Sequence, residues 1–350
     1  MGETNGTDLH MSPSSKPMVR KLGQLEAIEQ APVLNDDMNK ALLYEILTEQ
    51  QREHFEKTKD LDLSYTSEAT NLRFRVNIFQ DKKGISAVFR LISTTMPTME
   101  GLGLSPVVKD FANLHKGLVL VTGPAASGKS TTLAAIIDHI NKTRDDHVLT
   151  VEDPIEYVHV SQRCLVNQRE VGRNTKTFAS ALKGALREDP DVIMVGEMRD
   201  LETIELAITA AETGHLVFGT LHTGSAAKTI DRVINTFPSK AQAQIRAMLS
   251  ESLKGVVSQQ LLFSVDGSRV LAQEILVGTP AIGNMIRDGK TFQIPSIMQA
   301  SKKDGMSTMD GSLMDLVTRK IITPDEAYRK AFEKKTFEHL LTTKPDDIIS

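Results

Sequence analysis

The stretch Gly123-Pro124-Ala125-Ala126-Ser127-Gly128-Lys129-Ser130, followed by Thr131, matches the phosphate-loop pattern G-x-x-x-x-G-K-[ST] at every fixed position. Residues 118–122 before it indicate a short buried strand, and residues 133–138 after it predict a helix with an apolar face. The inward-pointing N–H groups of such a loop and the start of the helix favour phosphate. The stretch therefore predicts a triphosphate site; the alternative is a glycine turn that happens to carry Lys-Ser.

Two side chains of this loop have distinct predicted roles. Lys129 is expected to reach the β and γ phosphates, and the hydroxyl of Ser130 is expected to bind Mg²⁺. The other loop residues, with Thr131, are expected to surround the phosphates with backbone groups. The predicted ligands are therefore ATP and Mg²⁺.

Composition limits the class of protein. A chain of 350 residues exceeds the size at which single cores keep growing, roughly 250–300 residues, so two domains are expected. No apolar run is long enough to cross a membrane, and we expect no secretory signal. The single cysteine, Cys164, excludes a disulfide framework and a multi-cysteine zinc site. A net charge of -4 without a long basic block argues against nucleic acid as a partner.

Residues 1–92 predict a small α+β domain. Apolar residues recur at helical spacing over 39–58, and period-two alternation predicts three antiparallel strands, at 61–65, 72–79 and 85–92. The first few residues are expected to be loose. The breaker-rich residues 93–112 are expected to form a linker with a short helix.

Residues 113–350 predict the second domain. Strands and helices alternate there, which implies a parallel sheet with helices on both faces. The predicted strands are 118–122, 147–151, 191–196 and 216–220, and the predicted helices are 130–141, 177–188, 201–212 and 226–235. Further on, 240–262 predicts a helix and 269–277 a strand, followed by short helices to about residue 340.

Two acids stand at the ends of predicted strands. Glu152 follows the second strand, and Glu197 follows the apolar run before Gly196. Carboxylates at this edge of a parallel sheet lie over the ligand crevice, where they can order water or the Mg²⁺ shell. The alternatives are a surface turn for Glu152 and a helix cap for Glu197.

Two histidines, His215 and His222, bracket the fourth predicted strand. They are seven residues apart, so opposite ends are expected and a shared metal is not. For each histidine the alternative is a purely structural hydrogen bond, although His222, at the carboxyl end of the strand, could sense the γ-phosphate.

These blocks resemble the secretion superfamily of ATPases, which are hexameric motors. The matching blocks are the phosphate loop, an acidic box at 151–157, a Gly-Glu Walker B and a histidine box at 214–223. Within that superfamily the chain is most similar to the PilT-type retraction (twitching motility) ATPases of type IV pili. The resemblance runs from residue 7 to about 325, and it implies a PAS-like N-terminal domain, a RecA-like ATPase core and C-terminal helices.

The resemblance also implies roles for matching residues. Glu152 would activate or position water, Glu197 would support the Mg²⁺-water network, and His215 and His222 would couple the nucleotide to the neighbouring strand. Relatives contribute arginine fingers from the small domain to a neighbouring subunit's nucleotide. Here the matching arginines are Arg73, Arg75 and Arg90, for which the alternative is a solvated strand face.

Some positions depart from the pattern. Ala125 and Ala126 replace the Thr-Gly of relatives, so a change in loop flexibility is expected. Residues 281–288, AIGNMIRD, resemble the box Ala-Ile-Arg-Asn-Leu-Ile-Arg-Glu of retraction motors, with Gly283 in place of an arginine. The chain also begins without most of a helix that relatives carry, so we expect an upstream start or a trimmed small domain.

The sequence thus predicts a homohexameric Mg-ATP-driven motor that powers pilus retraction. It would act at the cytoplasmic face of the inner membrane on a pilus platform protein, alone or with a related retraction ATPase. One alternative is an accessory retraction paralogue, and another is an assembly or type II secretion ATPase. A nucleotide-gated scaffold without turnover and a DNA translocase are further alternatives.

Overall fold

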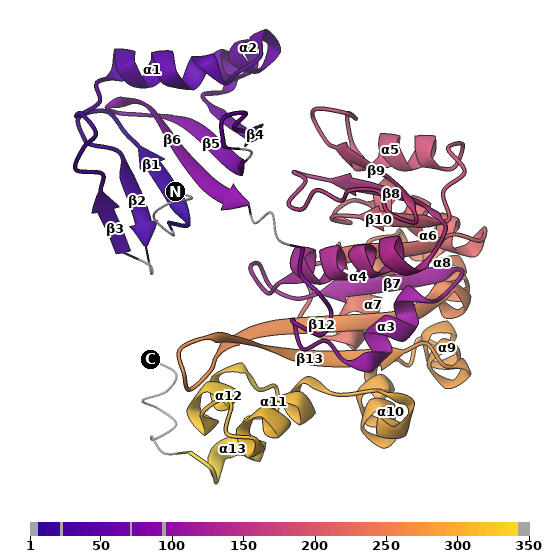
Figure 1. The fold of residues 1–350 in the computed structure, drawn as a ribbon. Helices are drawn as coiled ribbons and strands as arrows, with labels where there is room; N and C mark the ends of the chain where they lie inside the picture. The colour runs from indigo at the N-terminus through magenta and orange to yellow at the C-terminus, as the bar shows by residue number, and fades with distance from the viewer. Residues whose placement is uncertain (1–5, 22–23, 71, 93–95, 342–350) are drawn as a thin grey trace. The chain divides into compact units, whose positions relative to one another are not determined.

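The computed structural model describes residues 6–21, 24–70, 72–92 and 96–341, and the chain divides into two compact units (Figure 1). The small unit is Met1–Met96 with Pro154–Val158, and the large unit is Pro97–Asp153 with His159–Ser350. The division falls inside the predicted linker, of which residues 93–95 lie outside the described residues.

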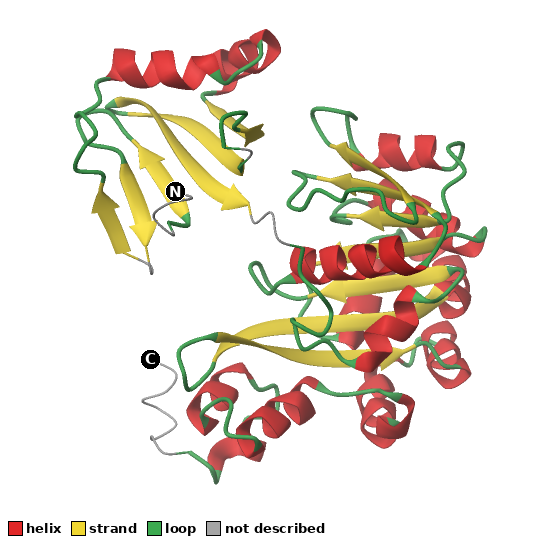
Figure 2. Cartoon of the chain, in the orientation of Figure 1, coloured by secondary structure: helices red, strands yellow, loops and turns green. Residues whose placement is uncertain are grey.

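The small unit is a six-stranded antiparallel sheet with helices on one face (Figure 2). The strand order is β3-β2-β1-β6-β5-β4. The strands are β1 (Asp8–Met11), β2 (Met18–Lys21), β3 (Gln24–Ala27), β4 (Asp60–Thr66), β5 (Arg73–Asp81) and β6 (Gly84–Ile92). The helices are α1 (Asp36–Glu45) and α2 (Glu49–Thr58), and side chains of Asn35 and Thr48 cap them.

Period-two alternation builds the core of this unit. Alternate residues of β5, such as Val76 and Ile78, are fully buried and join Leu43 and Phe55 of the helices in one apolar cluster. Intervening residues of β5 therefore lie on the face away from α1 and α2. The three predicted strands are confirmed as β4–β6, whereas the predicted helix over 39–58 is divided into α1 and α2 and β1–β3 were not anticipated.

The large unit is built on a seven-stranded sheet of order β13-β12-β7-β11-β10-β8-β9. All neighbours pair in parallel except β12 and β13. The strands are β7 (Gly117–Thr122), β8 (His147–Glu152), β9 (Leu165–Glu170), β10 (Val192–Val195), β11 (Leu216–Leu221), β12 (Leu253–Phe263) and β13 (Arg269–Val277). The predicted parallel sheet is confirmed, and β9 is an addition.

Helices cover both faces of this sheet (Figure 1). On one face are α3 (Pro106–Ala112) and α4 (Lys129–Thr143). On the other are α5 (Phe178–Ala185), α6 (Leu201–Glu212), α7 (Ala226–Asn235), α8 (Ser239–Ser252), α9 (Pro280–Arg287) and α10 (Ile294–Ala300). A third cluster joins the free end of the β12–β13 hairpin to α11 (Met309–Thr318), α12 (Pro324–Lys330) and α13 (Lys335–Glu338).

The predicted helix over residues 240–262 is wrong in its second half. Helix α8 ends at Ser252, and residues from Leu253 onward form β12 in the middle of the sheet. The close approach of α3 to this strand requires Gly255, because a Cβ there would lie 2.3 Å from the Phe111 ring. Although β12 is mostly buried, its sequence LKGVVSQQLLF mixes apolar and polar residues without a period of two, so its pattern does not distinguish strand from helix.

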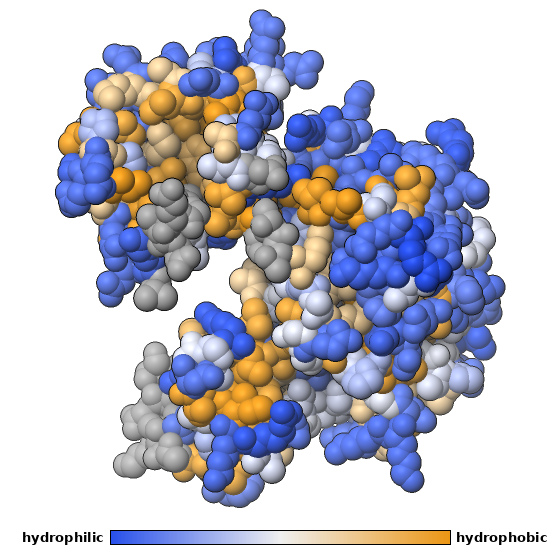
Figure 3. Space-filling view, in the orientation of Figure 1, coloured by the Kyte–Doolittle hydropathy of each residue, from blue (hydrophilic) through white to orange (hydrophobic). Residues whose placement is uncertain are grey.

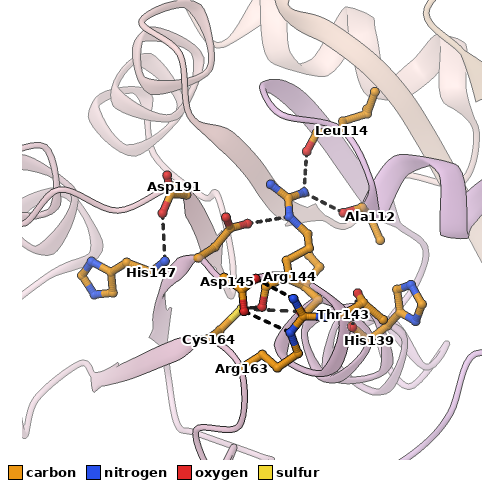
Figure 4. A network of polar contacts seen from close by, with 12 residues as sticks. Ala112, Leu114, His139, Thr143, Arg144, Asp145, His147, Arg163, Cys164 and Asp191 are labelled. Carbon is orange, nitrogen blue, oxygen red and sulfur yellow. Dashed lines mark hydrogen bonds and ion pairs between the residues drawn. The ribbon is translucent and has the colours of Figure 1, made fainter.

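An ion-pair network fixes the turn between α4 and β8 (Figure 4). The Arg144 guanidinium pairs with Asp146 at 2.5 Å and donates to the carbonyl oxygens of Ala112, the last residue of α3, and Leu114. The buried Cys164 thiol donates to the carbonyl oxygen of Arg144. Helix α3 is therefore anchored to the large unit at its C-terminal end.

Figure 3 shows hydrophobic surface over the C-terminal helices and the free end of the β12–β13 hairpin. Phe263, Val265 and Phe332 are among the exposed apolar side chains of this region. None of the helices in the described part of the chain is long and apolar enough to cross a membrane.

Gly283 permits a close contact between α9 and α8. A Cβ at this buried position would lie 2.8 Å from the backbone oxygen of Ser250, so a larger residue must push the helices apart. We expect Gly283→Arg to destabilise the protein by about 1–3 kcal/mol and to lower the midpoint of thermal unfolding by several degrees. Asn284→Arg, on the exposed side of the same helix, is the control and should change the midpoint little. Equal midpoints for the two variants would contradict the close packing.

Candidate nucleotide site

The phosphate loop joins the end of β7 to the start of α4, and its backbone explains its glycines. Gly123 has φ +147°, and a Cβ there would lie 2.4 Å from the backbone oxygen of Gln259. Gly128 has φ +89° and caps α4. Ala126 also has a positive φ, +60°, at a cost on the order of 1 kcal/mol for a residue with a Cβ. The loop thus keeps the conformation that a phosphate cradle needs.

The residues of this loop fit a nucleotide. The Nζ of buried Lys129 donates to the loop's own carbonyl oxygens, at Gly123 (3.0 Å) and Pro124 (2.9 Å). The buried Oγ of Ser127 has no hydrogen-bond partner within the part of the chain that the structure describes. Ser130 is exposed in the first turn of α4. A cationic side chain and a helix start can donate to phosphate oxygens, and the exposed hydroxyl oxygen of Ser130 is a ligand that suits Mg²⁺.

Glu197 lies at the same edge of the sheet. Its Oε1 pairs with Arg199 Nε at 2.5 Å and with His222 Nε2 at 3.1 Å. Burial would raise the pKa of Glu197, but Arg199, aided by His222 and Lys129, holds it below the ordinary value for a glutamate. Glu197 is therefore an ionised carboxylate within electrostatic reach of the phosphate-loop lysine.

Glu152 ends the neighbouring strand β8 and is almost fully buried. Its Oε1 accepts hydrogen bonds from Thr150 Oγ1 (2.6 Å) and Gln168 Nε2 (3.0 Å). Gly196 lets the two strand ends approach, since its N–H donates to Val151 and a Cβ there would lie 3.2 Å from the Glu152 Cα. The two acids of the sequence prediction therefore end adjacent strands.

The two histidines are separated by the length of β11. His222 reaches Glu197, whereas His215 precedes the strand, at the opposite edge of the sheet from the phosphate loop. There the Nδ1 of His215 is 3.0 Å from the carbonyl oxygen of Ala210, near the end of α6. The structure therefore groups His222 with the nucleotide loop and places His215 apart from it.

The three arginines share one face of the small unit's sheet. Arg75 and Arg90 are directly opposite each other on β5 and β6, and Arg73 is two residues along β5. Arg90 Nε pairs with Asp8 at 2.8 Å, and Arg75 lies 3.7 Å from Asp62. Burial would raise the pKa of Asp8, but Arg90 holds it below its usual range. Residues directly opposite each other on adjacent strands point to the same face, so the side chains of Arg75 and Arg90 are neighbours there, each beside a carboxylate.

Several residues around the acids were not singled out from the sequence. Arg199, two positions after Glu197, is the ion partner of that acid, and Thr150 and Gln168 hold Glu152. Of these residues, only Arg199 could have been predicted from the sequence, because a cationic side chain two residues after a strand-terminal acid lies close to that acid. Gln168 comes from β9, which the sequence did not predict.

Comparison with known proteins agrees with this fold. The family described as Type II/IV secretion system protein matches residues 4–309. The type IV pilus retraction ATPase PilT of Pseudomonas aeruginosa is 52% identical over 325 residues, which are 93% of this chain and 94% of that protein. A twitching motility protein of Neisseria gonorrhoeae is 49% identical over 317 residues, 90% of this chain and 84% of that protein.

A crystal structure of the pilus retraction motor PilT with bound ADP matches at a TM-score of 0.90 and 43% identity, covering 96% of each chain. The fold and the nucleotide site thus define the class of protein, a secretion ATPase. Within the family of Type II/IV secretion system proteins, the chain belongs to the PilT type. The predicted family, fold class and ATPase activity are confirmed.

Proposed function

We propose that this ATPase is the motor of type IV pilus retraction, converting ATP hydrolysis into the withdrawal of a pilus. The support is twofold: relatives named for retraction and for twitching motility match nearly the whole chain, and Glu197 is ion-paired at the phosphate-loop edge of the sheet. The motor would act at the cytoplasmic face of the inner membrane, on a platform protein of the pilus machinery.

For hydrolysis, each group would have one task. Lys129 would turn from the loop carbonyls to the β and γ phosphates, and Ser130 would hold Mg²⁺, which supplies charge neutralisation of the phosphate oxygens. Glu152 and Glu197 would orient the attacking water between them and share its activation. His222 would lie beside Glu197 near the γ-phosphate, and it would respond when that phosphate is released.

The arginines support a ring in which subunits complete each other's sites. We propose a homohexamer whose small units each present Arg73, Arg75 and Arg90 to the nucleotide of a neighbouring subunit. An arginine fork suits the charge that spreads over a transferring phosphoryl group. In such a ring His215, away from its own subunit's phosphate loop, would serve the contact between subunits or strands rather than the chemistry.

Domain movement would accompany each cycle, and two sets of contacts within the large unit support a location for its hinge. The side chain of Gln273 on β13 binds both Gly103 and Ser105, at 2.9 and 3.3 Å, and Arg144 holds Ala112. Residues from Gly103 onward are thus attached to the large unit. We place the hinge in the part of the predicted linker that precedes Gly103.

Surface motility of a deletion strain tests this function. Complementation with wild type or with the surface variant Glu202→Ala should restore pilus-dependent movement, and Glu197→Ala should not. If the deletion strain lacks pili altogether, the protein is an assembly ATPase. If movement persists in the deletion strain at a reduced level, the protein is an accessory retraction motor.

A further inference from the structure

A group of buried hydroxyls lies beneath the nucleotide site. Thr229 on α7 is fully buried, and its Oγ1 lies 2.6 Å from that of Thr223 and 2.7 Å from the carbonyl oxygen of Ser225. Thr122, the last residue of β7, is 2.8 Å from Ser258 and 3.4 Å from Thr229. Buried hydroxyls in an apolar sheet cost free energy unless they are paired, so this arrangement must hold its members in one geometry.

Hydrogen-bond donors in this group can be assigned by counting protons. The Thr229 hydroxyl has a single proton, and the 2.7 Å contact to the Ser225 carbonyl oxygen takes it in preference to the 3.4 Å contact to Thr122, since it is shorter and a carbonyl only accepts. Thr223 therefore donates to Thr229 Oγ1. The loop that follows β11 is consequently bound by a side chain of the helix that follows it.

His222 immediately precedes Thr223, and the backbone on its N-terminal side is held by a second hydrogen bond. Two residues before it, the Thr220 hydroxyl donates to the carbonyl oxygen of Gly196, next to Glu197. The backbone that carries His222 is thus attached at Thr220 to the strand end of the acid and at Thr223 to α7. His222 itself is half exposed, so its own burial does not fix it.

We propose that Thr229 is a positioning residue for ATP hydrolysis: by accepting the Thr223 hydrogen bond, it holds His222 against Glu197. This inference rests on the proposed role of His222 at the site. Thr229 is fully buried, so it would act through Thr223 and His222. Thr122, next to the phosphate loop, keeps its shorter contact with Ser258 when the Thr229 hydroxyl is removed. The change should therefore leave the loop intact and move the histidine, which affects turnover rather than binding.

The test compares Thr229→Val with Thr229→Ser. Valine keeps most of the shape, and the Thr229 N–H still donates to Ser225, so α7 should remain folded. We expect kcat for ATP to fall about tenfold or more in Thr229→Val, while the Kd of a fluorescent ATP analogue changes less than about threefold. Thr229→Ser, which keeps the hydroxyl, should restore kcat to within about twofold of wild type. Thr236→Val, the same change on the exposed end of α7, is the matched control.

A double-mutant cycle with His222→Ala separates positioning from a general structural role. If Thr229 acts through His222, then Thr229→Val should lower kcat no further once His222 is alanine. Multiplying effects, or a Kd that rises as kcat falls, would overturn the proposal. So would an unchanged kcat in His222→Ala, whereas a wild type without ATP turnover would overturn the function itself.

A second variant covers the case in which Thr229→Val does not fold. Thr223→Val removes the same hydrogen bond from its donor side, on a half-buried loop residue. We expect the same loss of kcat and the same dependence on His222. A Thr223→Val protein with wild-type kcat would contradict the proposal.

Discussion

Glu197→Gln is expected to lower kcat for ATP hydrolysis by at least about 100-fold while ATP still binds. Glutamine keeps the shape of the side chain, but it carries no charge and accepts no proton. In the wild type, burial would raise the pKa of Glu197, but Arg199 holds it below the ordinary value, so the carboxylate is ionised at neutral pH. Hydrolysis under saturating ATP, together with binding of a fluorescent analogue, measures both quantities.

Glu202→Gln provides the matched control. Glu202 lies in the first turn of α6, only five residues further along the chain, and forms an exposed pair with Lys183. An exposed ion pair contributes little, so this variant should hydrolyse ATP at the wild-type rate. If Glu197→Gln keeps more than about a third of wild-type kcat, the ion-paired acid is not part of the reaction.

Glu152→Gln, measured in the same assay, tests how Glu152 and Glu197 share the activation of water. Glu152 is held by Thr150 and Gln168 at the end of the strand next to that of Glu197, so both acids are placed to act on the same water. A loss larger than that of Glu197→Gln would assign proton transfer mainly to Glu152. Similar losses, with the double variant no slower than either single one, would mean that the two acids act as a unit.

His159 is expected to make the large unit sensitive to acid. Its side chain is buried, its Nδ1 has no hydrogen-bond partner among the described residues, and burial lowers its pKa to about 4 from 6.5. Between those pH values the unfolded chain takes up a proton that the folded chain does not. The contribution of His159 to the free energy of unfolding is therefore complete above pH 6.5. It is lost as the pH drops towards 4, by on the order of 3 kcal/mol in total.

Urea unfolding between pH 7.5 and 4.5, followed by a probe in the large unit, measures this effect. In His159→Gln, which does not titrate, the unfolding midpoint should depend less on pH than in wild type. His115→Gln, at an exposed histidine of the same unit, is the control and should keep the wild-type dependence. Equal pH profiles in all three proteins would show that His159 does not limit acid stability.

Acid should also reach the nucleotide site through His159. The backbone N–H of His159 donates to Gln168 Oε1 at 2.7 Å, and Gln168 in turn donates to Glu152. Charging the buried imidazole would displace this backbone and loosen the hydrogen bond that holds Glu152. Activity is therefore expected to fall before the whole unit unfolds.

The sequence predicted those parts of the fold that have a short-range signal. The phosphate loop, the strands of the parallel sheet and the helices between them follow from glycine spacing and apolar period. The four-residue strands β1–β3 lie in a polar stretch with no clear alternation, because only their pairing with β6 defines them. For the same reason, β12 is defined as a strand by its pairing with β7 and β13 and not by its own sequence pattern.

Positions of the site residues were less predictable than their identities. Glu197 and His222 were named from sequence, but their contact depends on β10 and β11 ending side by side. Arg75 and Arg90 were named as separate candidates, and only the register of β5 and β6 reveals that they face each other. Both contacts depend on how strands distant in the sequence are aligned with each other, and no local sequence pattern contains that information.

The single cysteine makes this protein convenient for spectroscopy. Cys164 is buried, burial raises the pKa of its thiol, and its proton is shared with backbone oxygens, so maleimide reagents should leave it unmodified. One new exposed cysteine in each unit would then accept a pair of fluorophores without any prior removal of native thiols. Energy transfer between the dyes could follow the distance between the two units through individual ATP cycles.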